Sequence, residues 1–162
     1  MKKGTVLILL TVMLSLALSA CSNNTKQSSI EAKVAPKEMA DQILKQIEQP
    51  MLMELEDEMI QKLYHLDPAL LEQHTIRVPL MNVKTNEIAI LKAKDAKDIP
   101  VIETAIKQRA ADVQKQFETY LPDQYENAKN YKLVVKGNYV LFVISERADD
   151  IVKAYDAFFE AQ

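Results

Sequence analysis

The sequence predicts an α+β fold in which two β-hairpins form an antiparallel sheet and amphipathic helices pack on that sheet. Two apolar runs, 131–136 and 139–144, are joined by Gly137-Asn138, which suits a primed hairpin turn because glycine accepts a positive φ without steric cost. A second pair of short runs, 76–80 and 87–91, comes earlier in the chain. Apolar residues at helical spacing flank both pairs. Strands joined by tight turns are antiparallel. The amphipathic helices bury their apolar stripes by packing on the sheet that these strands form.

Two helices are expected before the first hairpin. The first helix ends at Pro50, and the second covers 52–63 and leads into Tyr64. Their apolar stripes are Met39, Ile43, Leu44 and Ile47 in the first, and Leu52, Leu55, Met59, Ile60 and Leu63 in the second. Asp67-Pro68 then has the pattern of an N-cap followed by proline at the first helical position, which predicts a short turn.

The first hairpin is expected to lie at an edge of the sheet. Pro79 lacks a backbone donor, so it favours an edge strand for 76–80. Thr85-Asn86 is the predicted turn, and 87–91 returns as a more buried strand. Asp98 is the expected cap of the longest helix, which Pro122 closes; its apolar stripe is Ile102, Ile106, Ala110, Val113, Phe117 and Tyr120.

The last strand and helix complete the fold. The unbroken apolar run 139–144 predicts a central strand covered on both faces, although the pattern leaves open whether this strand pairs with the first hairpin. Ser145 is expected to cap a final helix with Asp149 and Asp150 near its start, where the helix dipole favours negative charge. The residues expected to face inward are Ile151, Val152, Tyr155, Phe158 and Phe159.

The N-terminal residues have the pattern of an export signal. Met1-Lys2-Lys3 is basic, and residues 6–20 carry no charge, which is typical of a secretory signal. Leu18-Ser19-Ala20-Cys21 resembles the lipobox of bacterial lipoproteins. That resemblance implies a diacylglyceryl group on the Cys21 sulfur and signal cleavage between Ala20 and Cys21, and two acyl chains hold stably in a membrane. The alternatives are an ordinary secretory signal and an uncleaved anchor helix.

The predicted organisation has three parts. Residues 1–20 form the lipoprotein signal peptide, 21–35 the lipidated N-terminus and a flexible polar tether, and 36–162 a single α+β globular domain. The expected localisation is the cell membrane, with the domain anchored on its extracytoplasmic face. The net charge of −3 and the absence of a long basic run argue against nucleic acid as a partner.

Four segments resemble the domain-of-unknown-function family 4358. They are KLYHLDPALLE, NEIAILKAKD, the spacing from Arg109 to Phe117-Glu-Thr-Tyr120-Leu-Pro122, and KGNYVLFVIS, and the resemblance extends from Met39 to Phe159. This family consists of small bacterial proteins, frequently lipoproteins, whose activity is not established. The resemblance therefore implies no reaction, substrate or cofactor. Its pattern has glycine where this chain has His65.

No motif in the sequence predicts a metal site or a cofactor. The two histidines, His65 and His74, flank different elements, and a zinc site needs three or four converging ligands. The acidic group at 54–58 lacks the alternating ligands and the glycine of a calcium loop, so we interpret it as the solvated face of a helix. Gly137 is the only glycine after the signal, which excludes glycine-rich phosphate loops.

No catalytic residues are predicted, and Arg109 is the leading candidate for a binding role. It lies at the edge of an apolar helical stripe, where a charge needs a partner or water. It either grips a carboxylate or phosphate of a ligand, together with Tyr64 and Tyr120, or forms an internal salt bridge, or lays its stem on the core with its head in solvent. The structural alternatives are favoured for all three residues.

The sequence is compatible with three functions. The favoured hypothesis is a membrane-anchored, non-catalytic binding domain that recognises another envelope protein or a small ligand. The second is an envelope enzyme that acts on wall or membrane precursors, with polar residues that meet only in the folded chain. The third, the solute-binding component of a transporter, fits poorly because such proteins have two lobes and longer chains.

Overall fold

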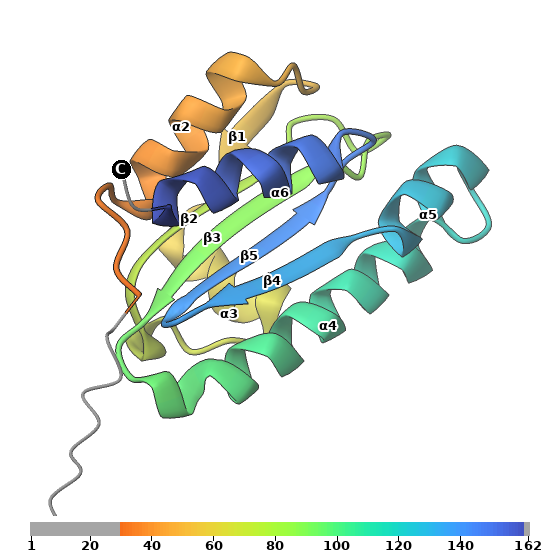
Figure 1. Cartoon of the computed structure of the whole chain (residues 1–162). Helices are drawn as coiled ribbons and strands as arrows, with labels where there is room; N and C mark the ends of the chain where they lie inside the picture. The colour runs from red at the N-terminus through yellow and green to blue at the C-terminus, as the bar shows by residue number, and fades with distance from the viewer. Residues whose placement is uncertain (1–29, 161–162) are drawn as a thin grey trace, which may run out of the picture.

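A computed structural model describes residues 30–160, which form a five-stranded antiparallel sheet with helices on both faces (Figure 1). The expected signal peptide, its cleavage site at Ala20-Cys21 and most of the tether lie outside the described residues. Within 30–160, no helix has both the length and the apolar character needed to cross a bilayer. The α+β class predicted from the sequence is confirmed.

The sheet has the strand order β1-β2-β3-β5-β4. Its strands are β1 (Leu52–Glu54), β2 (Leu71–Pro79), β3 (Glu87–Ala93), β4 (Lys132–Lys136) and β5 (Tyr139–Ile144). The two hairpins are joined through β3 and β5, a pairing that the sequence pattern left open. All six residues of β5 are buried, as expected for a central strand covered on both faces.

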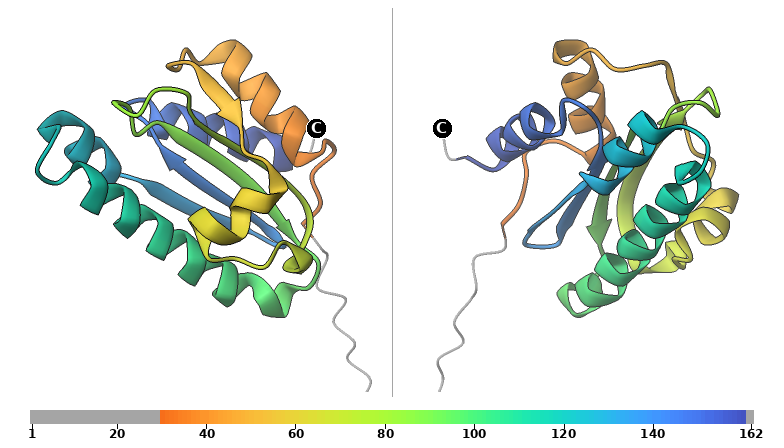
Figure 2. Two further views of the ribbon diagram at one scale, coloured as in Figure 1. Left: turned by 180° about the vertical axis from the view of Figure 1, so that it is seen from behind. Right: turned by 90° about the vertical axis from the view of Figure 1, so that its right-hand side faces the viewer.

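The helices form two layers, one on each face of the sheet (Figure 2). One face is covered by α2 (Pro36–Gln46) and α6 (Ala148–Asp156). The other is covered by α3 (Asp57–Tyr64) and α4 (Ile99–Phe117), with α5 (Pro122–Lys129) packed on α4. Alternate residues of the central strands point to opposite faces, so each layer of helices has its own apolar core.

The predicted helix over 52–63 is wrong in its first half. Residues 52–54 form β1, which pairs with the end of β2, and only 57–64 are helical. The pattern misled because Leu52, Leu55 and Met59 fit helical spacing, while a three-residue strand is too short to show alternation. The acidic group at 54–58 is therefore divided between a strand and the first turn of α3.

The predicted edge position of 76–80 is also wrong. β2 begins at Leu71 and lies between β1 and β3. Pro79 is its last residue, so the missing donor interrupts no bond inside the strand. The turn falls earlier than expected, with the Lys84 amide donating to the Met81 carbonyl, whereas Thr85 and Asn86 are buried.

Two helix boundaries differ from the prediction. α4 ends at Phe117, and Pro122 opens α5, which was not predicted, instead of closing the longest helix. Asp98 stands at the N-terminal boundary of α4 without a side-chain capping bond. α6 begins at Ala148, and the Ser145 hydroxyl accepts a bond from the Arg147 amide one turn earlier.

Residues 30–35, the last part of the expected tether, contact the folded body. Glu31 accepts a hydrogen bond from the Tyr139 hydroxyl and forms an ion pair with Lys92. Ala32 and Val34 pack against the core below α2 and α6. Residues 30–35 therefore belong to the folded body, because their few apolar and charged side chains find partners on it.

Local predictions based on backbone chemistry are confirmed. The Asp67 side chain accepts a bond from the Ala69 amide and begins a short 3₁₀ helix at Pro68. Gly137 has φ +56° in the β4–β5 turn, as the Gly-Asn pattern predicted. These features depend on neighbouring residues only, so the sequence suffices to predict them.

Candidate functional site

A cavity of about 200 Å³ opens at the end of the sheet where the loop between β2 and β3 lies. Its polar lining includes Lys84, Glu87 and Arg109, and its apolar lining includes Leu63, Val78 and Phe117. The lining therefore comes from α3, β2, the β2–β3 loop, the start of β3 and α4.

A buried ion pair lies at the cavity wall. The Arg109 guanidinium donates from Nε to Glu87 Oε1 at 2.9 Å and from Nη2 to Oε2 at 2.7 Å. The Tyr64 hydroxyl donates to the same Oε1 atom, and the guanidinium lies over the Tyr64 ring at 5.6 Å from the centroid. The Glu87 side chain is 1% exposed and that of Arg109 13%.

Three different elements carry these side chains. Glu87 is the first residue of β3, Tyr64 is the last of α3, and Arg109 lies midway along α4. Because Glu87 pairs with Ile144 across the sheet, its side chain shares the face that α3 and α4 cover. Arg109 therefore binds Glu87 in the bidentate geometry, which is the strong form of an arginine–carboxylate contact.

The electrostatics fix the protonation of Arg109 and Tyr64. Burial by itself would lower the pKa of Arg109, but the hydrogen bonds and the charge of Glu87 outweigh it and raise that pKa. Burial and the Glu87 charge both raise the pKa of Tyr64. At neutral pH the arginine is therefore charged and the phenol protonated. The Glu87 carboxylate accepts three hydrogen bonds. We therefore interpret this group of side chains as structural and not as a site of proton transfer.

A second polar cluster fastens the β2–β3 loop to α5 and to Glu146, which follows β5. The Thr85 amide donates to Gln124 Oε1 at 2.9 Å, and Asn127 Nδ2 donates to the Thr85 hydroxyl at 3.0 Å. Asn86 Nδ2 donates to Glu146 Oε2 at 2.7 Å. These bonds explain why two polar residues predicted as a turn are buried, and they hold one rim of the cavity in place.

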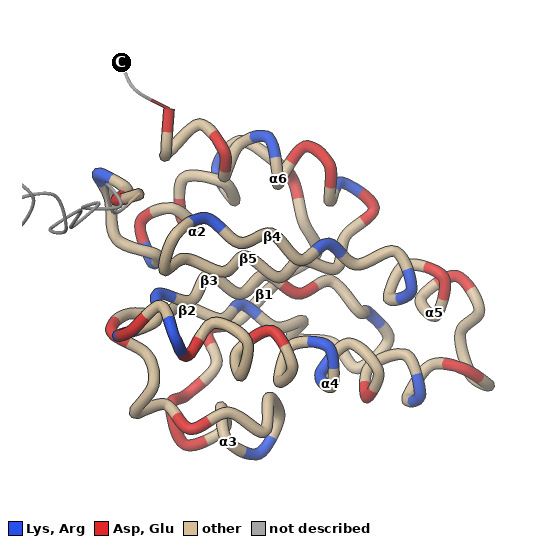
Figure 3. The backbone as a smooth tube through the Cα atoms, turned by 60° about the horizontal axis from the view of Figure 1, so that its bottom comes forward, with Lys and Arg blue, Asp and Glu red and all other residues tan. Residues whose placement is uncertain are grey.

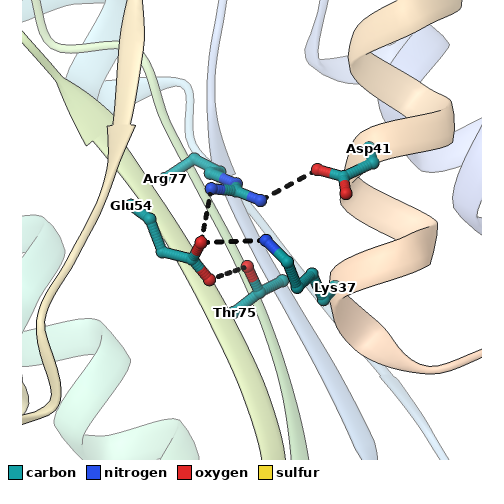
Figure 4. A network of polar contacts seen from close by, with 5 residues as sticks. All are labelled: Lys37, Asp41, Glu54, Thr75 and Arg77. Carbon is teal, nitrogen blue, oxygen red and sulfur yellow. Dashed lines mark hydrogen bonds and ion pairs between the residues drawn. The ribbon is translucent and has the colours of Figure 1, made fainter.

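A charged network on the opposite face of the sheet joins α2 to β1 and β2 (Figure 4). Arg77 donates to Asp41 at 2.8 Å and to Glu54 at 2.9 Å, and Lys37 donates to Glu54 at 2.9 Å. The hydrogen bond from Lys37, with the charge of Arg77, lowers the pKa of Glu54 although burial opposes it. The network fastens the short strand β1 to α2, and its members do not line the cavity.

The structure brings together two of the three predicted binding residues. Arg109 and Tyr64 meet at Glu87, in the internal ion pair that was one of the structural alternatives for Arg109. Tyr120 follows the end of α4, is 63% exposed and does not line the cavity. Sequence reasoning missed Glu87; the available signal was a single carboxylate opening an otherwise apolar strand.

The two histidines each contact a different carboxylate. His65 Nε2 lies 3.0 Å from Asp112, and His74 Nε2 lies 3.0 Å from Asp57. Among residues 30–160, no group of three histidine, cysteine or acidic side chains is arranged to hold a metal ion. His65 has φ 53° after the end of α3, a left-handed conformation that glycine adopts without steric cost.

The match to a known family includes every element of this site. The model of the family described as domain of unknown function (DUF4358) matches residues 45–145. The chain belongs to this family. In this DUF4358 protein the matched region includes the cavity, the Arg109–Glu87 ion pair and all five strands. Comparison with curated proteins and with solved structures gives no match.

Proposed function

We propose that this DUF4358 protein is a lipid-anchored, non-catalytic binding domain on the extracytoplasmic face of the cell membrane. The anchor is a diacylglyceryl group on Cys21, and the partner is another protein of the envelope or a small ligand. The observation that carries the binding part of the proposal is the position of the cavity, which lies at the end of the sheet remote from the tether.

The pairing of β3 with β5 gives the position of the cavity relative to Ile30. The Ile30 carbonyl oxygen would lie 3.1 Å from a Cβ placed on Gly137, so the chain joins the body beside the β4–β5 turn. Lys92 pairs with Tyr139 near that turn, whereas Glu87 pairs with Ile144 at the opposite end. Glu87 and Lys92 lie at opposite ends of β3 (Figure 1). The five residue steps between them, at about 3.3 Å each, separate the two ends by roughly 17 Å.

A tether that starts at Cys21 therefore leaves the cavity facing away from the membrane. If the polar segment 22–29 is a random coil, its reach is about 15 Å. The lipidated end and the β4–β5 turn lie near the bilayer in this arrangement, and the β2–β3 loop faces other envelope components. Arg109 and Glu87 at the cavity wall bond to each other, which suits recognition better than catalysis.

The anchor is tested by metabolic labelling with a radioactive fatty acid. Wild-type protein should incorporate the label, and Cys21→Ser should incorporate none while remaining folded. A Ser22→Ala variant is the matched control and should label as the wild type does. Equal labelling of Cys21→Ser would contradict the anchor, because no other thiol is present in the chain.

The binding surface is tested by site-specific photocrosslinking in intact cells. A photoreactive amino acid replaces Met81 beside the cavity or Val135 near the β4–β5 turn, both exposed positions. We expect a reproducible adduct from position 81 and none from 135. Adducts from 135 alone, or from neither position at native expression, would overturn the proposal that the remote end is the binding surface.

A further inference from the structure

An apolar strip lies next to the cavity on the same face of the sheet. Met53 pairs with Val78, and the Leu80 amide donates to the Met51 carbonyl at 3.0 Å, which continues the β1–β2 ladder by one pair. Directly paired residues share a face. Met51, Met53 and Leu80 therefore point to the side of Val78, which lines the cavity, and Met81 follows them. We name these four exposed residues, Met51, Met53, Leu80 and Met81, the corner strip.

The corner strip is a part of this face that α3 and α4 leave open. Its four side chains are 46–71% exposed, whereas Val78, Ala89 and Phe142 on the same face are buried under helices. Methionine adapts its shape to different apolar partners, and clusters of exposed methionine are typical of surfaces that bind amphipathic helices. β1 has only three residues and offers too short an edge for a partner strand. A helix laid on the strip would extend the existing layer of helices.

The charges beside the strip indicate the chemistry of the partner. Residues 46–61 contain five acidic side chains and no lysine or arginine. Glu54 and Asp57 have partners within the body, but Glu48, Glu56 and Glu58 are exposed and form no ion pair with any residue from 30 to 160. Figure 3 shows acidic positions at the beginning of α3. Lys84, at the cavity, is the cation in the adjoining loop.

We infer that the corner strip binds a cationic amphipathic helix of a partner protein. The apolar face of that helix covers Met51, Met53 and Met81, and its lysine or arginine side chains meet Glu56 and Glu58. An anionic membrane surface is the wrong partner for this strip, because the same carboxylates repel it and because the strip lies at the end remote from Ile30. The inference rests on the proposed function, which makes this end of the domain the binding surface.

The test uses the full chain in neutral-detergent micelles, with its methionine methyl groups labelled for NMR. The probe is a synthetic leucine–lysine peptide patterned as an amphipathic helix, and a leucine–glutamate peptide of the same pattern is its control. We expect the cationic peptide to shift the methyl signals of Met51, Met53 and Met81, while buried Met39 stays unchanged. The acidic peptide should shift none of them.

Matched variants separate the apolar and the charged contributions. Met51→Ser with Met81→Ser should weaken binding of the cationic peptide by about tenfold or more, and Val101→Ser with Val135→Ser should leave it unchanged. Glu56→Gln with Glu58→Gln should weaken binding and reduce its salt dependence. Its control is the exposed pair Glu118→Gln with Asp123→Asn. All these positions are at the surface, where substitution leaves the fold intact.

Three results would overturn the inference. They are equal shifts with both peptides, binding unaffected by the Met51 and Met81 substitutions, and methyl shifts caused by phosphatidylglycerol in the micelles instead of by the cationic peptide. If the peptide fails while position 81 still crosslinks in cells, the cationic-helix chemistry is wrong and the proposed function stands. If both fail, both proposals are wrong.

Discussion

Replacing Arg109 by leucine removes one half of a buried ion pair. The variant leaves the Glu87 carboxylate, 1% exposed, with the Tyr64 hydroxyl as its remaining side-chain donor. Loss of one member of a buried pair costs about 3–5 kcal/mol of the free energy of unfolding. At about 3–5 °C per kcal/mol for a domain of this size, the melting temperature should fall by about 9–25 °C. Circular dichroism during thermal and urea unfolding measures both quantities.

Two further variants make this prediction refutable. Arg147 forms an exposed ion pair with Asp150, so Arg147→Leu should change stability by less than about 1 kcal/mol. Removing the whole polar group, with Arg109→Leu, Glu87→Leu and Tyr64→Phe together, should recover most of the lost stability because no unpaired polar group remains. If Arg109→Leu is as mild as Arg147→Leu, the ion pair does not hold this site together.

The remaining predictions concern the backbone and the pH dependence of stability. Gly137→Ala should destabilise by about 1–2 kcal/mol in urea unfolding, because φ is +56° and the new Cβ would lie 3.1 Å from Ile30 atoms; equal stability would contradict the turn geometry. His65→Gly should be about 1 kcal/mol more stable than His65→Ala, since both lose the contact with Asp112 but only glycine relieves the left-handed strain. The lowered pKa of Glu54 adds stability that is complete above pH about 4.3 and is lost as the pH falls through the lower folded pKa. Glu54→Gln should therefore show a flatter decline of the melting temperature in acid, and a decline identical to that of the wild type would refute the Lys37 and Arg77 contacts.

The sequence predicted the elements that depend on local chemistry. The Gly137-Asn138 turn, the Asp67-Pro68 cap and the fully buried strand 139–144 have signals within a few residues. The short elements were missed for a physical reason. β1 and α5 are stabilised by tertiary contacts with β2 and α4, and their own sequences show neither clear alternation nor a strong apolar stripe.

The candidate site could be predicted only in part. Arg109 and Tyr64 were recognisable because each polar group stands beside an apolar stripe and needs a partner. The identity of that partner, Glu87, depends on the register of β3 and on the packing of α4, which the sequence does not specify. The same register places Met53 beside Val78 and makes four separate apolar residues one surface.

The lipid anchor is tested by the mass of the N-terminal peptide of the protein recovered from growing cells. We predict a peptide that begins at Cys21 and carries the added mass of a diacylglyceryl group on the sulfur. An unmodified Cys21 thiol, or a peptide that still contains residues 1–20, would contradict the anchor and with it the orientation of the binding surface.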